Sequence, residues 1–273
     1  MKKSSQKFPQ KSVVRKKHGK KLAKAQPREL RKRGWMVVGF DTSMSSIAGA
    51  AIGYDRTLDK YVGPKFSYLR WEKEDHYFAR LSEAAKSHEI VLGLQADLGL
   101  LLNLDEIFIA QEEPWPMGMS RGGLSAFMKQ QAEISGAFLG GLLRYGYKEI
   151  WQINSIRWRK LIADDLGITT HHSKWKSPEL AEQYNCKPGD SGKFRSKEWA
   201  FHTLGISPWL AQAGFPEEIP DWPDIIESKD GKKPRPEGSI AKAVQPDDRY
   251  DSLAIMEWLR EEISETLDEL TQG

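Results

Sequence analysis

The chain has 273 residues, 39% of them hydrophobic, so it is long enough for one large domain with its own core. No stretch approaches the roughly 20 apolar residues of a membrane span, and the first lysines are not followed by the apolar segment of a secretory signal. Cys186 is the single cysteine, which excludes an intrachain disulfide and suits a reducing compartment. These features predict a cytoplasmic protein with no membrane partner.

Charge is divided unevenly along the chain. Residues 1–34 contain 14 Lys or Arg and one acidic residue, whereas residues 35–273 contain 27 basic and 37 acidic residues. The first segment lacks apolar periodicity, which predicts a disordered basic arm. Such an arm could bind nucleic acid by releasing phosphate counterions, and a solubilising or localisation role is the alternative. Its candidate DNA-binding residues are the clustered Lys16, Lys17, Lys20 and Lys21.

Strand patterns dominate the first part of the body, residues 35–273. Two apolar runs, 35–41 and 47–55, are joined by the polar turn TSMSS and predict an antiparallel hairpin, and 65–71 predicts a third strand. Apolar residues at helical spacing follow over 77–103. The next segments predict a buried strand that ends at two glutamates before Pro114, a helix over 124–146 that packs on the sheet through Gly140 and Gly141, and a short strand over 148–153.

The second part of the body has a different texture. Residues 164–246 are rich in Pro, Gly and Lys, and predict a loop-rich insertion with one helix near 196–204. The last segment predicts one long helix, because apolar side chains form a single stripe along it: Leu253, Met256, Leu259, Ile263, Leu267 and Leu270. Strands followed by helices in this order predict an α/β fold with a mixed sheet, antiparallel first and parallel later.

Carboxylates stand at the ends of three predicted elements. Asp41 ends the first strand, Glu112 and Glu113 end the central one, and Asp248 and Asp251 share a face at the start of the last helix. Taken singly, each has an ordinary role as a turn or helix cap. Gathered in one cleft, they would repel each other unless a cation lay between them. Two divalent ions roughly 4 Å apart would relieve the repulsion and activate water to attack a phosphodiester.

Three segments carry a family resemblance. GFDTSMSSIAGAAI, IFIAQEEPW and DDRYDSLAIMEWL resemble, in this order, the RuvC-type Holliday junction resolvases of the ribonuclease H-like superfamily. The resemblance covers residues 35–163 well and 193–262 in part. It implies a ribonuclease H-like mixed five-stranded sheet flanked by helices, and two Mg²⁺ ions per active site, for which Mn²⁺ can substitute. The metal ligands that it implies are Asp41, Glu112, Asp248 and Asp251, with Glu113 left open as the alternative to Glu112.

Weaker matches extend the resemblance. Trp115 stands three residues after Glu112, where the family has an aromatic residue that stacks at the junction, although packing in a loop is the alternative. Lys160 and Lys197 resemble basic residues that the family places near the scissile phosphate. The basic arm and the long insertion depart from the family pattern, and bacteriophage-type members are the nearest kin that the resemblance suggests.

The leading hypothesis is therefore a Mg²⁺-dependent endodeoxyribonuclease that resolves four-way (Holliday) or other branched DNA, acting as a homodimer in a bacterial cell or a phage-infected host. The alternative is a ribonuclease H-like nuclease that cleaves flaps, forks or RNA–DNA hybrids. Two further hypotheses have less support. A non-enzymatic DNA-binding protein would leave the acidic cluster without a cause, and an actin-like kinase would need a second domain of the same type, which the sequence does not repeat.

Overall fold

The structure is a computed structural model that describes residues 34–44, 46–71, 76–114, 126–169, 175–183, 188–202 and 247–272. Almost all of the predicted basic arm lies outside these ranges, as do its four candidate lysines. Trp115 and more than half of the predicted insertion also lie outside them.

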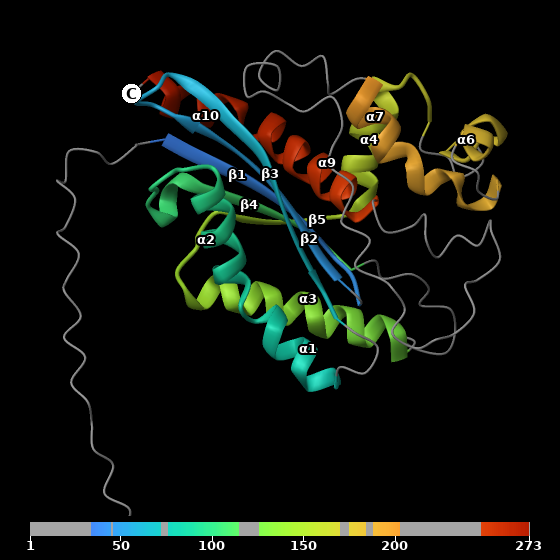
Figure 1. Cartoon of the computed structure of the whole chain (residues 1–273), viewed down its shortest axis with the longest axis horizontal. Helices are drawn as coiled ribbons and strands as arrows, with labels where there is room; N and C mark the ends of the chain where they lie inside the picture. The colour runs from blue at the N-terminus through green and yellow to red at the C-terminus, as the bar shows by residue number, and fades with distance from the viewer. Residues whose placement is uncertain are drawn as a thin grey trace, which may run out of the picture. The chain divides into compact units, whose positions relative to one another are not determined.

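One mixed sheet forms the centre of the described body (Figure 1). Its strands lie in the order β3-β2-β1-β4-β5, in which β1 pairs antiparallel with β2 and parallel with β4. β2 pairs antiparallel with β3, and β4 pairs parallel with β5. This is the ribonuclease H-like topology, so the predicted mixed five-stranded α/β sheet is confirmed. The strands are β1 Gly34–Thr42, β2 Ser46–Asp55, β3 Lys60–Arg70, β4 Ile107–Glu112 and β5 Ile150–Ile153.

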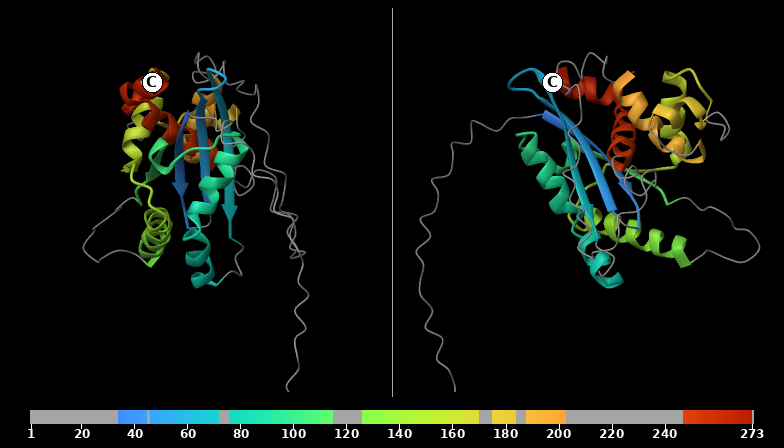
Figure 2. Two further views of the ribbon diagram at one scale, coloured as in Figure 1. Left: turned by 90° about the vertical axis from the view of Figure 1, so that its left-hand side faces the viewer. Right: turned by 45° about the vertical axis from the view of Figure 1, so that its right-hand side comes forward.

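Helices cover both faces of the sheet, as Figures 1 and 2 show. One face is covered by α1 Tyr77–Ala84, α2 Ser87–Asp97 and α3 Ala126–Arg144, and the short η2 Leu104–Glu106 precedes β4. The other face is covered by α4 Ser155–Asp165, α7 Arg195–His202, α9 Asp247–Glu262 and α10 Ser264–Gln272. Two further elements, α6 Pro178–Gln183 and η3 Pro188–Phe194, lie between α4 and α7 in the chain. Within the described residues, no helix is long and apolar enough to cross a membrane.

Two predicted helices are each divided in two. The pattern over 77–103 forms α1 and α2, which are separated at Ala85 and Lys86. A Cβ on Gly141 of α3 would lie 2.3 Å from the Ala85 carbonyl oxygen, so this glycine serves the approach of α3 to the α1–α2 corner. The prediction that Gly140 and Gly141 face the sheet is therefore wrong, because a Cβ on Gly140 would meet no atom within 4 Å.

The predicted last helix bends at Ile263, between α9 and α10. The apolar stripe still faces the core on both sides of the bend, with Leu259 and Leu267 buried. Beyond the bend, α10 reaches the first strand, where the Trp35 indole donates a hydrogen bond to Thr271 Oγ1 at 3.1 Å. The bend therefore allows one continuous stripe to cover the sheet as far as the start of β1.

Residues 164–246, the predicted insertion, contain more than the one helix expected there, which corrects that expectation. Besides α7, its described part includes α6 and η3. Trp175, Leu180 and Phe194 are buried there, so these short elements have apolar contacts of their own. The high content of Pro, Gly and Lys conceals this pattern, because the buried side chains are too widely spaced to show a helical period.

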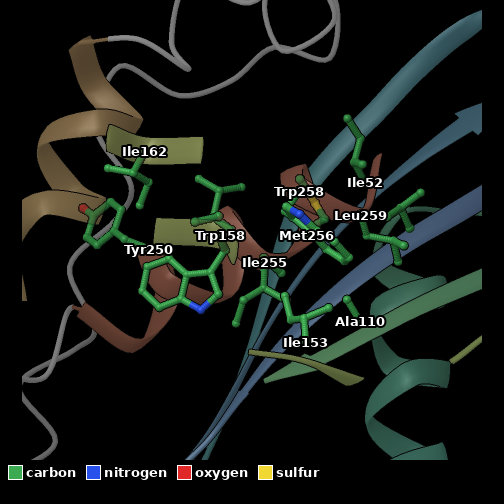
Figure 3. Close-up of a cluster of buried hydrophobic side chains, with 14 of the residues drawn as sticks. Ile52, Ala110, Ile153, Trp158, Ile162, Tyr250, Ile255, Met256, Trp258 and Leu259 are labelled. Atoms are coloured by element: carbon green, nitrogen blue, oxygen red, sulfur yellow. The ribbon is translucent and has the colours of Figure 1, made fainter. Parts of the chain in front are cut away.

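The sheet has one hydrophobic core on each face, and the side chains along each strand alternate between the two cores. Successive strand residues point to opposite faces, so Trp35 and Val37 join the core under α9 whereas Met36 and Val38 join the core under α3. Figure 3 shows the first core, where α4, α9 and the strands meet; it labels Ile52, Ala110, Ile153, Trp158, Ile162, Tyr250, Ile255, Met256, Trp258 and Leu259. Any residue an even number of positions from Val37 along β1 therefore faces α9.

Small residues bring α9 close to the sheet. Gly39 pairs with Ala50 of β2 and Ala110 of β4, which forms a row of small side chains across three strands. A Cβ on Gly39 would lie 2.3 Å from the Met256 nitrogen and 2.4 Å from the Ser252 oxygen. Both atoms belong to the backbone of α9, so only glycine permits this approach.

Candidate functional site

The two strand acids lie next to each other at one edge of the sheet. β1 and β4 are parallel neighbours, with Phe40 paired to Gln111, so Asp41 and Glu112 follow in the same register. Asp41 is two residues beyond Gly39, and Glu112 is two beyond Ala110, which places both on the face that α9 covers. Glu113 follows the end of β4 and is exposed.

Helix α9 brings the other two acids to the same place. The helix crosses β1 at Gly39, and its first turn lies beyond that crossing, toward Asp41. Asp248 and Asp251 are three residues apart, which is close to one helical turn. Both act electrostatically on the strand acids, since each raises the pKa of Asp41 and of Glu112. The four carboxylates that the resemblance implies are therefore close enough to affect one another electrostatically.

Burial and mutual repulsion strongly raise the pKa values of these acids. Burial is the largest cause that raises the pKa of Asp41 well above its ordinary value, followed by the charges of Glu112, Asp248 and Asp251. Burial and then the charge of Asp251 raise the pKa of Glu112 to about 7. Burial also raises the pKa of Asp251 to about 7, with the charge of Asp248 adding to the rise. Such an arrangement is costly in free energy without a bound cation.

Two serines, which sequence reasoning missed, hold the α9 acids from opposite sides. Ser46 Oγ, at the start of β2, donates to Asp248 Oδ2 at 2.7 Å. Ser196, on α7, donates to Asp251 Oδ1. Ser46 is in turn fixed by the turn between β1 and β2, where its backbone nitrogen donates to Ser43 Oγ at 3.0 Å. The polar turn TSMSS was a visible signal for Ser46, whereas nothing local marks Ser196.

Arg159 places a positive charge beside the acids. This residue lowers the pKa of Asp41, Glu112 and Asp251, which opposes the effect of burial on each. Helix α4 carries it to the site directly after β5, because Asn154 caps the helix by accepting a hydrogen bond from the Ile156 nitrogen at 2.9 Å. The predicted Lys160 is its neighbour on α4, and both residues are exposed.

Trp158, on the same helix, also affects one of the acids. Its side chain is 1% exposed, and its indole nitrogen lowers the pKa of Glu112, although their geometry falls short of a regular hydrogen bond. The Arg159 guanidinium lies 5.1 Å from the centre of the Trp158 ring, at a distance typical of cation–π contacts. The predicted Lys197 lies on α7, with its ammonium 5.8 Å from the ring centre of Tyr250, the residue next to Asp251.

The chemistry of the donors suits a hard divalent cation, since Mg²⁺ and Mn²⁺ prefer carboxylate oxygens and a negative field. The positions of these side chains fit a bound ion less closely than their chemistry does. Among the described residues, no three His, Cys, Asp or Glu side chains are gathered tightly enough to hold one ion as they stand. The residues that could hold a cation are Asp41, Glu112, Asp248 and Asp251, whose carboxylate oxygens are of the kind that such an ion prefers.

Comparison with known proteins supplies one structural likeness. No family model and no curated protein sequence matches the chain. The chain is similar to the solved structure of T. thermophilus RuvC in complex with a Holliday junction substrate, at 9% identity and a TM-score of 0.41, over 85% of this chain and 96% of that one. A further Thermus thermophilus RuvC structure matches over the same shares at 12% identity, with a TM-score of 0.40. At such low scores, the fold assignment rests on the strand order and register described above.

Proposed function

We propose that the protein is a metal-dependent endonuclease that cleaves phosphodiester bonds in branched DNA, with four-way junctions as its substrate. The observation that carries the proposal is the meeting of carboxylates from β1, β4 and α9 at one edge of the sheet, where burial and repulsion raise the pKa of Asp41, Glu112 and Asp251. Acids shifted in this way by burial and like charges are typical of functional sites.

Divalent cations bound here would polarise the phosphate and lower the pKa of water, which is the chemistry of phosphodiester hydrolysis. The four carboxylates would hold the ions. Arg159 acts on three of these acids, so it lies close enough to attract the phosphate of a bound strand. Lys197, above Tyr250, adds positive charge on the α7 side of the same site.

The substrate class follows from the sequence resemblance rather than from the site alone. Cleavage of two opposed strands at a four-way junction requires two active sites, which a two-fold homodimer would supply. Trp115 would stack on an unpaired base at the branch, and the basic arm, with Lys16, Lys17, Lys20 and Lys21, would bind the phosphates of the duplex arms.

The test is a cleavage assay on four-way junctions, forks, flaps, RNA–DNA hybrids and linear duplex, with Mg²⁺ or Mn²⁺ titrated from zero. We expect metal-dependent cleavage of the junction that is lost in Asp41→Asn and Asp251→Asn, while junction binding persists. Asp97→Asn is the matched control, because Asp97 is an exposed acid at the end of α2. Full cleavage by both site variants would refute the proposal. Preference for hybrids or flaps would replace the junction with the alternative substrate.

A further inference from the structure

Helix α7 is firmly anchored beside the acidic site. Trp199 is fully buried, and its indole nitrogen donates to Asp165 Oδ2, at the end of α4, at 2.8 Å. Arg195 is also buried; it donates to the Trp175 carbonyl at 2.8 Å and pairs with Glu198 at 2.5 Å. These contacts fix the helix from both sides of Ser196, so the direction of that side chain is set by packing.

Ser196 uses this position to reach an acid 55 residues away in the chain. The side chain is 2% exposed, and its hydroxyl donates to Asp251 Oδ1. A serine in a helix commonly bonds instead to a carbonyl of its own preceding turn. The bond to Asp251 also complements that of Ser46 to Asp248, so Asp248 and Asp251 both receive a serine hydroxyl.

We propose that Ser196 is a positioning residue, whose hydroxyl holds the Asp251 carboxylate in the orientation that binds a divalent cation. This inference rests on the proposed function. Hydrogen bonds from outside the ligand set orient metal-binding carboxylates, and their loss typically weakens metal affinity or activity by about 10- to 100-fold. Docking of α7, which belongs to the inserted segment, is then part of how the metal site is assembled.

The experiment measures Mn²⁺ binding to the full chain without DNA, by electron paramagnetic resonance, beside thermal melting. Ser196→Ala should weaken Mn²⁺ binding by about 10- to 100-fold. Ser191→Ala is the matched control, because Ser191 bonds to the Pro188 carbonyl within the same segment, and it should leave Mn²⁺ affinity unchanged. Ser196→Thr keeps the hydroxyl and should bind Mn²⁺ nearly as wild type does.

A double-mutant cycle separates positioning from general loss of structure. In an Asp251→Asn background, Ser196→Ala should cause no further loss of Mn²⁺ affinity, because the group that it orients is already changed. An equal additional loss there, or wild-type affinity in Ser196→Ala, would overturn the inference. If Asp251→Asn, together with Asp41→Asn, keeps full junction cleavage, the proposed function fails. If Asp251→Asn is inactive while Ser196→Ala binds Mn²⁺ normally, only the role of Ser196 fails.

Discussion

Replacing Gly39 with alanine should test how the fold builds the site, without changing any proposed ligand. The new Cβ would lie 2.3 Å from the Met256 nitrogen and 2.4 Å from the Ser252 oxygen, and an ordinary contact begins at 3.4 Å. Both atoms belong to the backbone of a buried helix, so no side chain can rotate away. Helix α9 must therefore move from β1 by about 1 Å, and its first-turn acids must move with it.

The displacement of α9 has two expected consequences, one for stability and one for the rate of cleavage. Overpacking of this kind costs about 1–3 kcal/mol of unfolding free energy. A shift of about 1 Å in a catalytic group can reduce the rate by about 10²-fold. We therefore expect Gly39→Ala to remain folded at 25 °C, to bind the junction, and to cleave it about a hundredfold more slowly than wild type.

The assay combines urea unfolding with single-turnover cleavage of a four-way junction at saturating protein. Gly136→Ala is the control, because Gly136 is exposed in α3 and a Cβ there would meet no atom within 4 Å. That control should stabilise the protein by about 0.5–1 kcal/mol and leave cleavage unchanged. Wild-type stability of Gly39→Ala would refute the close approach of α9. Lower stability with wild-type cleavage would refute the claim that this approach places the acids.

Three further predictions follow from the charges. Glu112→Gln should reduce cleavage by more than about 100-fold and Glu113→Gln far less, because neighbouring residues of an extended chain face opposite ways. The reverse order in the cleavage assay would make Glu113 the ligand. Deletion of residues 1–34 should flatten the salt dependence of junction binding by about 0.9 in log–log slope for each phosphate that the arm neutralises, and an unchanged slope would remove the arm from the DNA interface. In EDTA, the unfolding free energy should fall as pH rises from about 4 to about 7. The reason is that folded Glu112 and Asp251, with pKa values of about 7, retain protons that the unfolded chain has released. The fall should be at most about 1.4 kcal/mol per pH unit for each acid. Denaturant titrations of wild type and Glu112→Gln would measure this, and equal pH slopes for the two would contradict it.

Local sequence patterns were sufficient to predict those features of the fold that depend on local rules. The antiparallel-then-parallel sheet follows from the order of strands and helices. The same local rules did not locate the breaks between helices. The bend at Ile263 leaves the apolar stripe intact, so hydrophobic periodicity carries no sign of it.

The missed site residues depend on contacts between distant segments. Arg159 and Lys160 are adjacent, exposed basic residues on one helix, so the local sequence does not show that Arg159 acts on the acids. Ser196 differs from Ser191 in no local feature that would mark it as the partner of Asp251. Sequence patterns predicted the acids because carboxylates at the ends of three apolar elements form an unusual combination, whereas a single serine in a Pro- and Gly-rich segment is ordinary.

Helix α9 links the stability of the protein to the geometry of the site. Its Leu253, Met256 and Leu259 are fully buried in the core, and its first turn carries Asp248 and Asp251. The free energy that holds the repelling acids close therefore comes from apolar burial further along the same helix. Because the acids and the core side chains lie on one helix, we expect changes in core packing to displace the carboxylates even where no acid is altered. The site is thus built into the main core rather than carried on a separate loop, which explains how the fold keeps like charges close before any cation is bound.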